Sequence, residues 1–475
     1  MKDPLDPMKE LLSRLGEQHE ARVKQELIAK GLRLVAVDNG GGDDATFEQT
    51  LAAMADGAEV IAGACLRQLP FRGYTDFLVR CERPSKLGAY SYQVWEAKLA
   101  LEMKMEFATQ LCCYAEMLQA MQGVRPEFAA VVLGNMERES INIGDYYDFY
   151  LAEKKDFLTQ QLEFDAGQMP DPFQSASHGD WSRYVDQLRQ ERDHLSKVAN
   201  IRRDQIAKLE QAGIKTMAAL ANSEDQQVPK LKQESLEILK QQAIMQVRAE
   251  KSGFPEAIPR RPRKGASHGL AALPLHDPAD LFWDLEGYPL EPRGHEYLWG
   301  CVYLDERGNS KFWERWAHDS EQEQQAFMDF IQWTHERWRS NPGMHIYHYA
   351  HYEVTACKRL MERYEVCKPQ FDELLENHVF VDLYKIVRSG IVAGASGYSL
   401  KNLERIYYGK KRDTSVATGD DSVVEYANWR ETKDGETWQS SKILNSIREY
   451  NKEDCESTLA LTNWLREIQS NAGIK

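Results

Sequence analysis

The first part of the chain alternates between helical and strand-like hydrophobic patterns. Residues 8–31 carry apolar side chains at helical spacing and end at Gly31, which predicts an opening helix. After an alanine-rich helix near 46–56, short apolar runs separated by turns predict three successive strands, AEVIAGACL, RGYTDFLVRCE and YSYQVWEAKLA. A helix at about 106–121 and a further strand, EFAAVVLGN, complete the pattern. We therefore expect an α/β domain over residues 1–140.

The pattern weakens between residues 141 and 250. YYDFYLAEKKDFLTQQL keeps a helical period, and a Pro/Ser-rich loop follows it. Residues 197–221 predict two short helices joined at AGI, the arrangement of a helix-hairpin-helix, which can present backbone N–H groups to a phosphate. We expect residues 141–250 to form a helical appendage. Pro, Gly and basic residues cluster without a period at 251–280, which predicts a linker.

Residues 281–475 return to a regular alternation of strands and helices. LFWDLEGYP predicts a buried strand, and EYLWGCVYLDE and SKFWERWA predict two meander strands after it. They are followed by helix 321–339, strand MHIYHYA, helix 352–364, the short strand VFVDLYKIV and a terminal helix at 442–466. This order predicts a ribonuclease-H-like α/β layer.

Composition limits how the chain can meet a partner. With 59 Lys+Arg against 74 Asp+Glu, the net charge is −15, so nucleic acid would have to be bound by local patches. The densest basic run lies in the predicted linker and could follow a phosphate backbone between two sites, or could simply be solvated; it comprises Arg260, Arg261, Arg263 and Lys264. The eight scattered cysteines disfavour a thiolate zinc site and a disulfide framework. No signal peptide or long apolar run is present, so we expect a cytoplasmic protein with no membrane partner.

A first group of candidate catalytic residues lies in the predicted three-strand unit. Asp76 falls within the second strand, and Glu96 and Lys98 are two apart on the third and share a face. Two carboxylates on adjacent strands can hold a hard divalent cation, and an ammonium group can hold the attacking water or stabilise phosphate charge. Gln110 and Tyr114 share a face of the next helix, where they could contact a nucleic-acid backbone or support the site. The alternative is a surface hairpin with ordinary charges.

The ordered set GYTDFL, YQVWEAKLA and QLCCY resembles the RecB-like branch of the PD-(D/E)XK nucleases, including a Gln-x-x-x-Tyr helix signature. The resemblance covers about residues 10–140 and implies a restriction-endonuclease-like fold, with His19 of the first helix as a further metal ligand. Relatives often carry cysteines that bind an iron-sulfur cluster. The corresponding segment here, SASHGDWSRYVDQ, keeps Trp181 but has no cysteine, so we expect no such cluster.

A second group of candidate catalytic residues lies in the C-terminal region. Asp284 and Glu286 are two apart on a predicted strand and point to the same side, and Tyr450 and Asp454 are four apart on one helix face. Two metal ions roughly 4 Å apart, bridged by such carboxylates, can activate a water and stabilise a leaving 3′ oxygen. The tyrosine would orient that water. Each pattern taken alone also fits an ordinary solvated face.

Two further acids lie between these blocks, Glu353 in HYEVTACKRL and Asp382 in VFVDLYK. In their order along the chain, the blocks resemble the DEDD exonucleases of the DnaQ-like, ribonuclease-H-like superfamily, in the form with a tyrosine in the last motif. The resemblance implies Asp284, Glu286, Glu353 and Asp454 as the four acids. The family usually has aspartate at the third position, so Asp382 is an alternative or supporting ligand.

The whole chain resembles a family of bacterial nucleases that carry a RecB-like domain, a cysteine segment, a helix-hairpin-helix stretch and a DEDD-like domain in this order. In many relatives a superfamily one helicase follows. This chain has no GxxxxGK[ST] loop, so we expect no ATPase activity in it, and a helicase would be a separate partner or part of a longer protein.

The favoured function is a Mg²⁺- or Mn²⁺-dependent nuclease with two active domains, acting on DNA ends or single strands in repair, recombination or defence against foreign DNA. One alternative is a catalytically degenerate subunit that docks DNA or a helicase. Another is an RNA exonuclease acting through the C-terminal domain.

Overall fold

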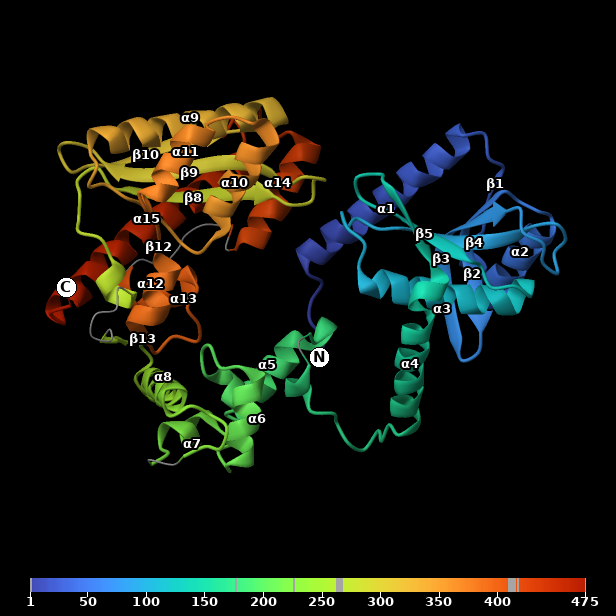
Figure 1. Cartoon of the computed structure of the whole chain (residues 1–475), viewed down its shortest axis with the longest axis horizontal. Helices are drawn as coiled ribbons and strands as arrows, with labels where there is room; N and C mark the ends of the chain where they lie inside the picture. Colours follow the sequence, from blue (N-terminus) through green and yellow to red (C-terminus); the bar gives the residue numbers. More distant parts are fainter. Residues whose placement is uncertain are drawn as a thin grey trace. The chain divides into compact units, whose positions relative to one another are not determined.

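A computed structural model describes residues 2–175, 177–224, 227–261, 268–408, 416 and 418–474. The chain forms two compact units (Figure 1). The N-terminal unit consists of Leu5–Pro170 together with Leu290–Arg293, and the C-terminal unit consists of Met1–Pro4, Asp171–Pro289 and Gly294–Lys475. Among the described residues, no helix is both long and apolar enough to cross a membrane.

The N-terminal unit is built on a six-stranded sheet in the order β1-β2-β3-β4-β5-β6. Its strands are β1 (Leu34–Ala36), β2 (Val60–Gln68), β3 (Phe71–Cys81), β4 (Ser91–Ala97), β5 (Phe128–Val132) and β6 (Arg138–Asn142). β2, β3 and β4 form an antiparallel meander, and β5 joins β4 in parallel. The meander lies where the sequence predicts three strands.

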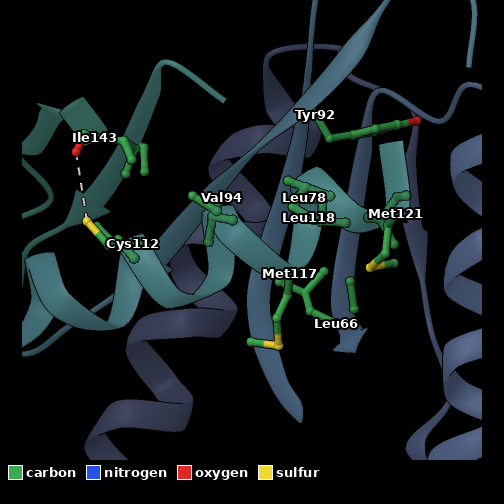
Figure 2. Close-up of a cluster of buried hydrophobic side chains, with 14 of the residues drawn as sticks. Leu66, Leu78, Tyr92, Val94, Cys112, Met117, Leu118, Met121 and Ile143 are labelled. Carbon is green, nitrogen blue, oxygen red and sulfur yellow. Dashed lines mark hydrogen bonds between the residues drawn. The ribbon is translucent and has the colours of Figure 1, made fainter. Parts of the chain in front are cut away.

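Helices cover both faces of this sheet. They are α1 (Pro7–Ala29), α2 (Asp43–Ala55), α3 (Met105–Gln122) and α4 (Ile143–Leu162). Val23 and Leu27 of α1 pack against Phe77 on one face, while α3 covers the other face. Figure 2 shows the core under α3, where Met117, Met121, Leu118 and Cys112 meet inward-facing residues of the strands. Successive residues of a strand alternate between these two cores, as the period of two requires.

The sequence analysis predicts that residues 141–250 form one appendage, but the helix α4 packs into the N-terminal unit instead. Ile143 and Tyr150 of α4 belong to the core of the N-terminal unit. Tyr150 Oη donates a hydrogen bond to Glu116 on α3 at 2.5 Å, and Lys154 pairs with the same carboxylate at 2.6 Å. Because its apolar side and its polar contacts both face α3, α4 completes the first unit. The two units meet along the chain at residues 170 and 171 rather than near 140.

The C-terminal unit contains a five-stranded sheet in the order β10-β9-β8-β11-β12. Its strands are β8 (Leu281–Tyr288), β9 (His295–Leu304), β10 (Ser310–Trp316), β11 (Ile346–His348) and β12 (Phe380–Asp382). The three meander strands are antiparallel, and β11 is parallel to β8 and β12. Trp283 packs into a core on one face and Phe282 into a core on the other. Burial on both faces explains the nearly continuous apolar run of β8.

Two layers of helices enclose this sheet. α9 (Ser320–Ser340), α10 (Tyr352–Tyr364) and α11 (Lys368–Glu376) supply one core, and α12 (Leu383–Gly390), α13 (Leu400–Tyr407) and α15 (Lys442–Asn471) supply the other. α14 (Gly419–Thr432) packs beside α15. The predicted strand VFVDLYKIV is wrong beyond Asp382. There the carboxylate accepts a hydrogen bond from the backbone N–H of Tyr384 and so caps α12.

The described residues from Asp171 to Ser252 form a helical region within the C-terminal unit. Its helices are α5 (Ser182–Glu191), α6 (Arg203–Gln211), α7 (Met217–Ala221) and α8 (Gln233–Ser252), and α6 and α7 are the two short helices that the sequence predicts. Gln242 of α8 donates a hydrogen bond to the backbone oxygen of Ala393 at 2.7 Å and accepts one from Tyr398 Oη at 2.7 Å. These buried bonds fasten α8 to the second sheet's helical layer.

The segment predicted as a linker at 251–280 also packs into the C-terminal unit where it is described. β7 (Ala257–Pro259) pairs in antiparallel fashion with β13 (Ile391–Ala393). A 3-10 turn, η5 (Gly269–Ala272), packs on α12. Its first residue has a φ of +62° and lies against the backbone of Gly390, where a side chain would collide. Low periodicity here therefore reflects short irregular packing rather than a free spacer.

Candidate active sites

Three carboxylates come together on the face of the second sheet that α15 covers. Asp284 and Glu286 of β8 and Asp454 of α15 each contribute one oxygen to a group whose members lie within 4.8 Å of one another. Glu286 is 6% exposed and Asp454 8% exposed. The predicted spacing of two along the strand explains why the first two side chains point to the same side. Clustered carboxylate oxygens are the ligands that hard divalent cations such as Mg²⁺ and Mn²⁺ prefer.

The electrostatics of this cluster fit a bound cation. Burial, and then the neighbouring charge of Asp454, raise the pKa of Asp284 well above its usual value. Burial raises the pKa of Glu286 to about 8, and Asp454 contributes to this shift. Like charges this close together repel one another, and a divalent cation among the three carboxylates would offset that repulsion. The donor set therefore suits a metal ion.

Two neutral side chains that the sequence analysis did not single out hold these acids. Asn451 Nδ2 donates a hydrogen bond to Asp284 Oδ2 at 2.8 Å, and Ser422 Oγ donates one to Glu286 Oε2 at 2.6 Å. Asn451 precedes Asp454 by three residues and so shares its helix face, a signal that could have identified it. Ser422 lies on α14, a helix that the sequence analysis did not predict, and no spacing in the sequence marks Ser422 as a site residue.

Tyr450 lies next to the acids, where the helical spacing predicts it. It is 4% exposed and hydrogen-bonded to Asp454. Lys401 of α13 donates a hydrogen bond to Tyr450 Oη at 2.9 Å. Burial, and then the charge of Asp454, raise the pKa of Tyr450, so the phenol stays protonated. The charge of Lys401 partly opposes the rise in the pKa of Asp284, which burial dominates, so Lys401 is a further site residue that the sequence analysis missed.

Glu353 lies near the cluster but outside its compact group of three. It sits in the first turn of α10 and is 3% exposed. Its charge contributes to the raised pKa of Asp284. Its Oε2 atom lies 3.4 Å from Nδ1 of His348, and neither atom has a hydrogen-bond partner among the described residues. The longer side chain at the position where aspartate was expected therefore turns toward a histidine.

Asp382 supports the neighbouring backbone, and its oxygens are not among those that gather in the cluster. Its Oδ1 atom accepts hydrogen bonds from the backbone N–H of Ala350 at 3.1 Å and of Tyr384 at 3.0 Å. Ala350 has a φ of +74° and directly precedes His351, the N-cap of α10. Asp382 thus fixes the turn that leads to Glu353, and its role as an alternative or supporting ligand stays a prediction.

The N-terminal unit brings together Asp76 of β3, Glu96 of β4 and Lys98, which follows β4. The backbone N–H of Asp76 donates to Glu96 Oε1 at 3.2 Å, and Lys98 Nζ lies 2.9 Å from Glu96 Oε2. Asp76 Oδ2 accepts from the backbone N–H of Ala97 at 2.7 Å. Burial, and then the charge of Asp76, raise the pKa of Glu96 to about 7. The adjacent strands therefore form the predicted carboxylate pair with a lysine beside it.

Gln110 and Tyr114 of α3 brace the strand that carries Asp76. Gln110 Nε2 donates to Tyr114 Oη at 3.0 Å, and that hydroxyl donates to the backbone oxygen of Tyr74 at 2.9 Å. The ring of Tyr114 covers Gly73, where a Cβ atom would collide with it. These contacts support the strand, and contact of the pair with a nucleic-acid backbone stays a prediction.

The first helix supplies two more side chains to this region. His19 is fully buried, and its Nε2 atom lies 3.0 Å from the backbone oxygen of Val132. Its Nδ1 atom has no hydrogen-bond partner among the described residues. Burial raises the pKa of the nearby Asp76. The sequence analysis did not consider Glu20, which interacts with the same aspartate. Burial, and then the charge of Asp76, raise the pKa of Glu20.

The predicted basic run is only partly described. Arg260 donates from its backbone N–H to the oxygen of Gly390 at 2.7 Å, so it is attached to the C-terminal unit. Arg261 is exposed. Arg263 and Lys264 lie outside the described residues.

Comparison with known proteins identifies the class of the second domain. Residues 281–466 match the family model of the RNase H superfamily. The matched range runs from β8 into α15 and contains Asp284, Glu286, Glu353 and Asp454. The C-terminal part of the chain is therefore an RNase H-like domain with a carboxylate cluster that could bind a metal, as expected for a metal-dependent nuclease. No curated protein and no solved structure matches the chain.

Proposed function

We propose that this protein is a Mg²⁺- or Mn²⁺-dependent nuclease that hydrolyses phosphodiester bonds of DNA, with the cluster of Asp284, Glu286 and Asp454 as an active site. The observation that carries the proposal is the meeting of three carboxylate oxygens within 4.8 Å inside an RNase H-like domain. A divalent ion bound there would supply activation of water and stabilisation of the leaving oxygen.

The chain's own groups have defined tasks in this proposal. Asn451 and Ser422 hold the carboxylates in place by donating hydrogen bonds to them. Tyr450 is kept protonated beside Asp454 and is directed by Lys401, so its hydroxyl can orient a water molecule. A tyrosine in this position matches the resemblance to exonucleases, which supports stepwise removal of terminal nucleotides.

The N-terminal unit is the proposed second nuclease centre. Asp76 and Glu96 would hold the cation together with His19, and Lys98, held by Glu96, would stabilise developing charge on the phosphate. The motif order supports a RecB-like PD-(D/E)XK domain here. The same resemblance supports DNA ends or single strands as substrates, a separate helicase partner, and a role in repair, recombination or defence against foreign DNA.

A second candidate function follows from Glu353. Its carboxylate faces His348 rather than joining the other three acids, which favours weakened catalysis at the C-terminal site. In that case the protein would serve mainly to bind DNA or to dock a partner.

Digestion assays separate these functions. End-labelled linear single- and double-stranded DNA, closed circular DNA and RNA would be incubated with Mg²⁺ or Mn²⁺ and the wild type, Lys98→Ala, Asp454→Asn or the double variant. Lys104→Ala and Glu467→Gln serve as matched controls, because both side chains are exposed.

We expect Asp454→Asn to stop the release of terminal nucleotides and Lys98→Ala to stop internal cleavage. Preferential digestion of RNA would instead support an RNA exonuclease. A wild type that binds DNA but cuts nothing with either metal would support the binding subunit instead.

A further inference from the structure

A polar pocket of about 420 Å³ lies between α8 and the segment that runs from β13 into α13. Figure 1 shows these elements in the C-terminal unit, next to one another. The polar side chains that line the pocket are Gln246, Glu250, Ser396, Lys401, Asn402 and Arg405. Its volume falls in the range of small-molecule sites, of roughly 300–1,000 Å³, and is enough for about one nucleotide.

The walls of this pocket are held together rigidly. Gln242 of α8 is hydrogen-bonded to the backbone of Ala393 and to Tyr398. At Gly394, which lines the pocket, a Cβ atom would come 2.7 Å from the backbone oxygen of Met245 on α8. A backbone approach this close needs glycine, and it fixes the distance between the two walls. The pocket is therefore formed in advance of any ligand.

The charges around the pocket favour an anion. Lys401 and Arg405 are its two cations, and its one acid, Glu250, pairs with Lys197 at 2.8 Å. Arg405 donates one hydrogen bond, to the backbone oxygen of Gly253 at 2.9 Å, and makes no other among the described residues. A guanidinium has five N–H donors in a planar fork that suits phosphate oxygens, so most of its capacity is left for a ligand.

Lys401 connects the pocket to the acid cluster. It lines the pocket and also donates to Tyr450 Oη at 2.9 Å, and Tyr450 in turn is bonded to Asp454. The pocket therefore begins one side chain away from the residues that would act on a phosphodiester bond.

We propose that this pocket binds one nucleotide of a single-stranded nucleic acid, with a backbone phosphate at Arg405, adjacent to the bond held at the acid cluster. The inference rests on the proposed nuclease function and extends it to α8, which lies outside the region that matches the RNase H superfamily. The helical region before the second sheet thereby becomes part of the substrate site.

Binding can be measured without cleavage in the Asp454→Asn background. The affinity for a labelled twelve-residue oligothymidylate would be measured by fluorescence anisotropy, with labelled oligouridylate in a second arm. The Asp454→Asn parent would be compared with variants of it that add Arg405→Glu, Arg405→Lys, Ser396→Trp or Arg307→Glu. Arg307 is the matched control, because it is exposed in the turn between β9 and β10 and its reversal changes the net charge equally. Ser396→Trp fills the pocket without changing its charge.

We expect Arg405→Glu to raise the Kd about tenfold or more. The slope of the logarithm of the binding constant against the logarithm of the salt concentration should become shallower by about one, as expected for the loss of one phosphate contact. Arg405→Lys should restore most of the affinity, Ser396→Trp should weaken binding, and Arg307→Glu should leave it within about twofold. Equal effects of Arg405→Glu and Arg307→Glu, or no effect of Ser396→Trp, would overturn the proposal. The two oligonucleotide arms tell whether DNA or RNA is preferred. Pocket-dependent binding by a protein whose wild type cuts nothing would refute the nuclease function and leave the pocket assignment standing.

Discussion

Asn451 donates a hydrogen bond to Asp284 from a position directly over Gly300 of β9, where a Cβ atom would collide with its amide oxygen. The contact joins the terminal helix to the central strand and orients a half-buried carboxylate without adding a charge. Hydrogen bonds from neighbouring groups to metal-binding side chains typically change metal affinity by about 10- to 100-fold. Two predictions rest on this relationship.

Replacing Asn451 with alanine should weaken divalent-metal binding by about tenfold or more while leaving the fold intact, since Asp284 loses the donor that orients it. Asn463→Ala is the matched control, because that residue is exposed on the same helix and the change in helix propensity is the same. Calorimetric titration with Mn²⁺ measures the affinity. Equal affinities for the two variants would show that the hydrogen bond does not support a metal site.

Gly300→Ala should destabilise the protein by about 1–3 kcal/mol, because the new methyl group overlaps the amide of Asn451. The cost should fall markedly when Asn451→Ala is already present, since the overlapping group is then gone. A double-mutant cycle from urea unfolding tests this coupling. Purely additive effects of the two substitutions would mean that Gly300 is required for another reason.

The stability of the metal-free protein should decrease as the pH rises from about 5 to about 8. The pKa of Glu286 is raised to about 8, so the folded state retains a proton that the unfolded chain releases near its ordinary carboxyl pKa. The stabilisation from this group is present at low pH and is lost as the pH rises through 8, by at most about 1.4 kcal/mol per pH unit. Mn²⁺ should therefore raise the thermal midpoint more at pH 8.5 than at pH 6, compared with EDTA.

The Asp454→Asn variant supplies the control for this comparison. It removes one carboxylate of the cluster, so the extra stabilisation by Mn²⁺ at high pH should shrink strongly. The N-terminal carboxylates shift in the same direction, because the pKa of Glu96 is raised to about 7, and they remain in this variant. An unchanged metal effect in Asp454→Asn would assign the pH dependence to the N-terminal unit.

Glu353→Gln should reduce metal affinity far less than Asp454→Asn. Glu353 lies outside the group of three carboxylates and faces His348, whereas Asp454 is one of the three. We expect a loss of about tenfold for the former and loss of measurable binding for the latter, by the same calorimetric titration. A larger loss in Glu353→Gln would show that its carboxylate reaches the metal when the ion is bound.

The sequence predicted the elements with strong periodicity, and through them much of the geometry of both acidic clusters. Asp284 and Glu286 share a strand face because side chains alternate, and Tyr450 lies beside Asp454 because they are one helical turn apart. Local spacing determines such relationships. The RNase H-like class of the second domain was predicted in the same way, from the alternation of its strands and helices, and is supported by the family comparison.

Residues brought in from other elements could not be predicted. Lys401 and Ser422 reach the site from α13 and α14, and their positions depend on tertiary packing that leaves no pattern in a single sequence. The backbone contacts of Asp382 could not be predicted either, because its carboxylate caps α12 and accepts a hydrogen bond from Ala350, a residue 32 positions away in the chain. The linker at 251–280 was misjudged because a three-residue strand is too short to show a period.

Because β7 pairs with β13, the smallest gene fragment that encodes all the partners of the second domain is longer than the region that the family comparison detects. A gene fragment that began at Leu281 would encode the acids of the second site, yet it would leave the backbone of β13 without its partner strand and Ala393 without Gln242. A fragment cut at Asp171 would keep both. Recombination that exchanged this domain between proteins would therefore have to carry the helices in front of it as well.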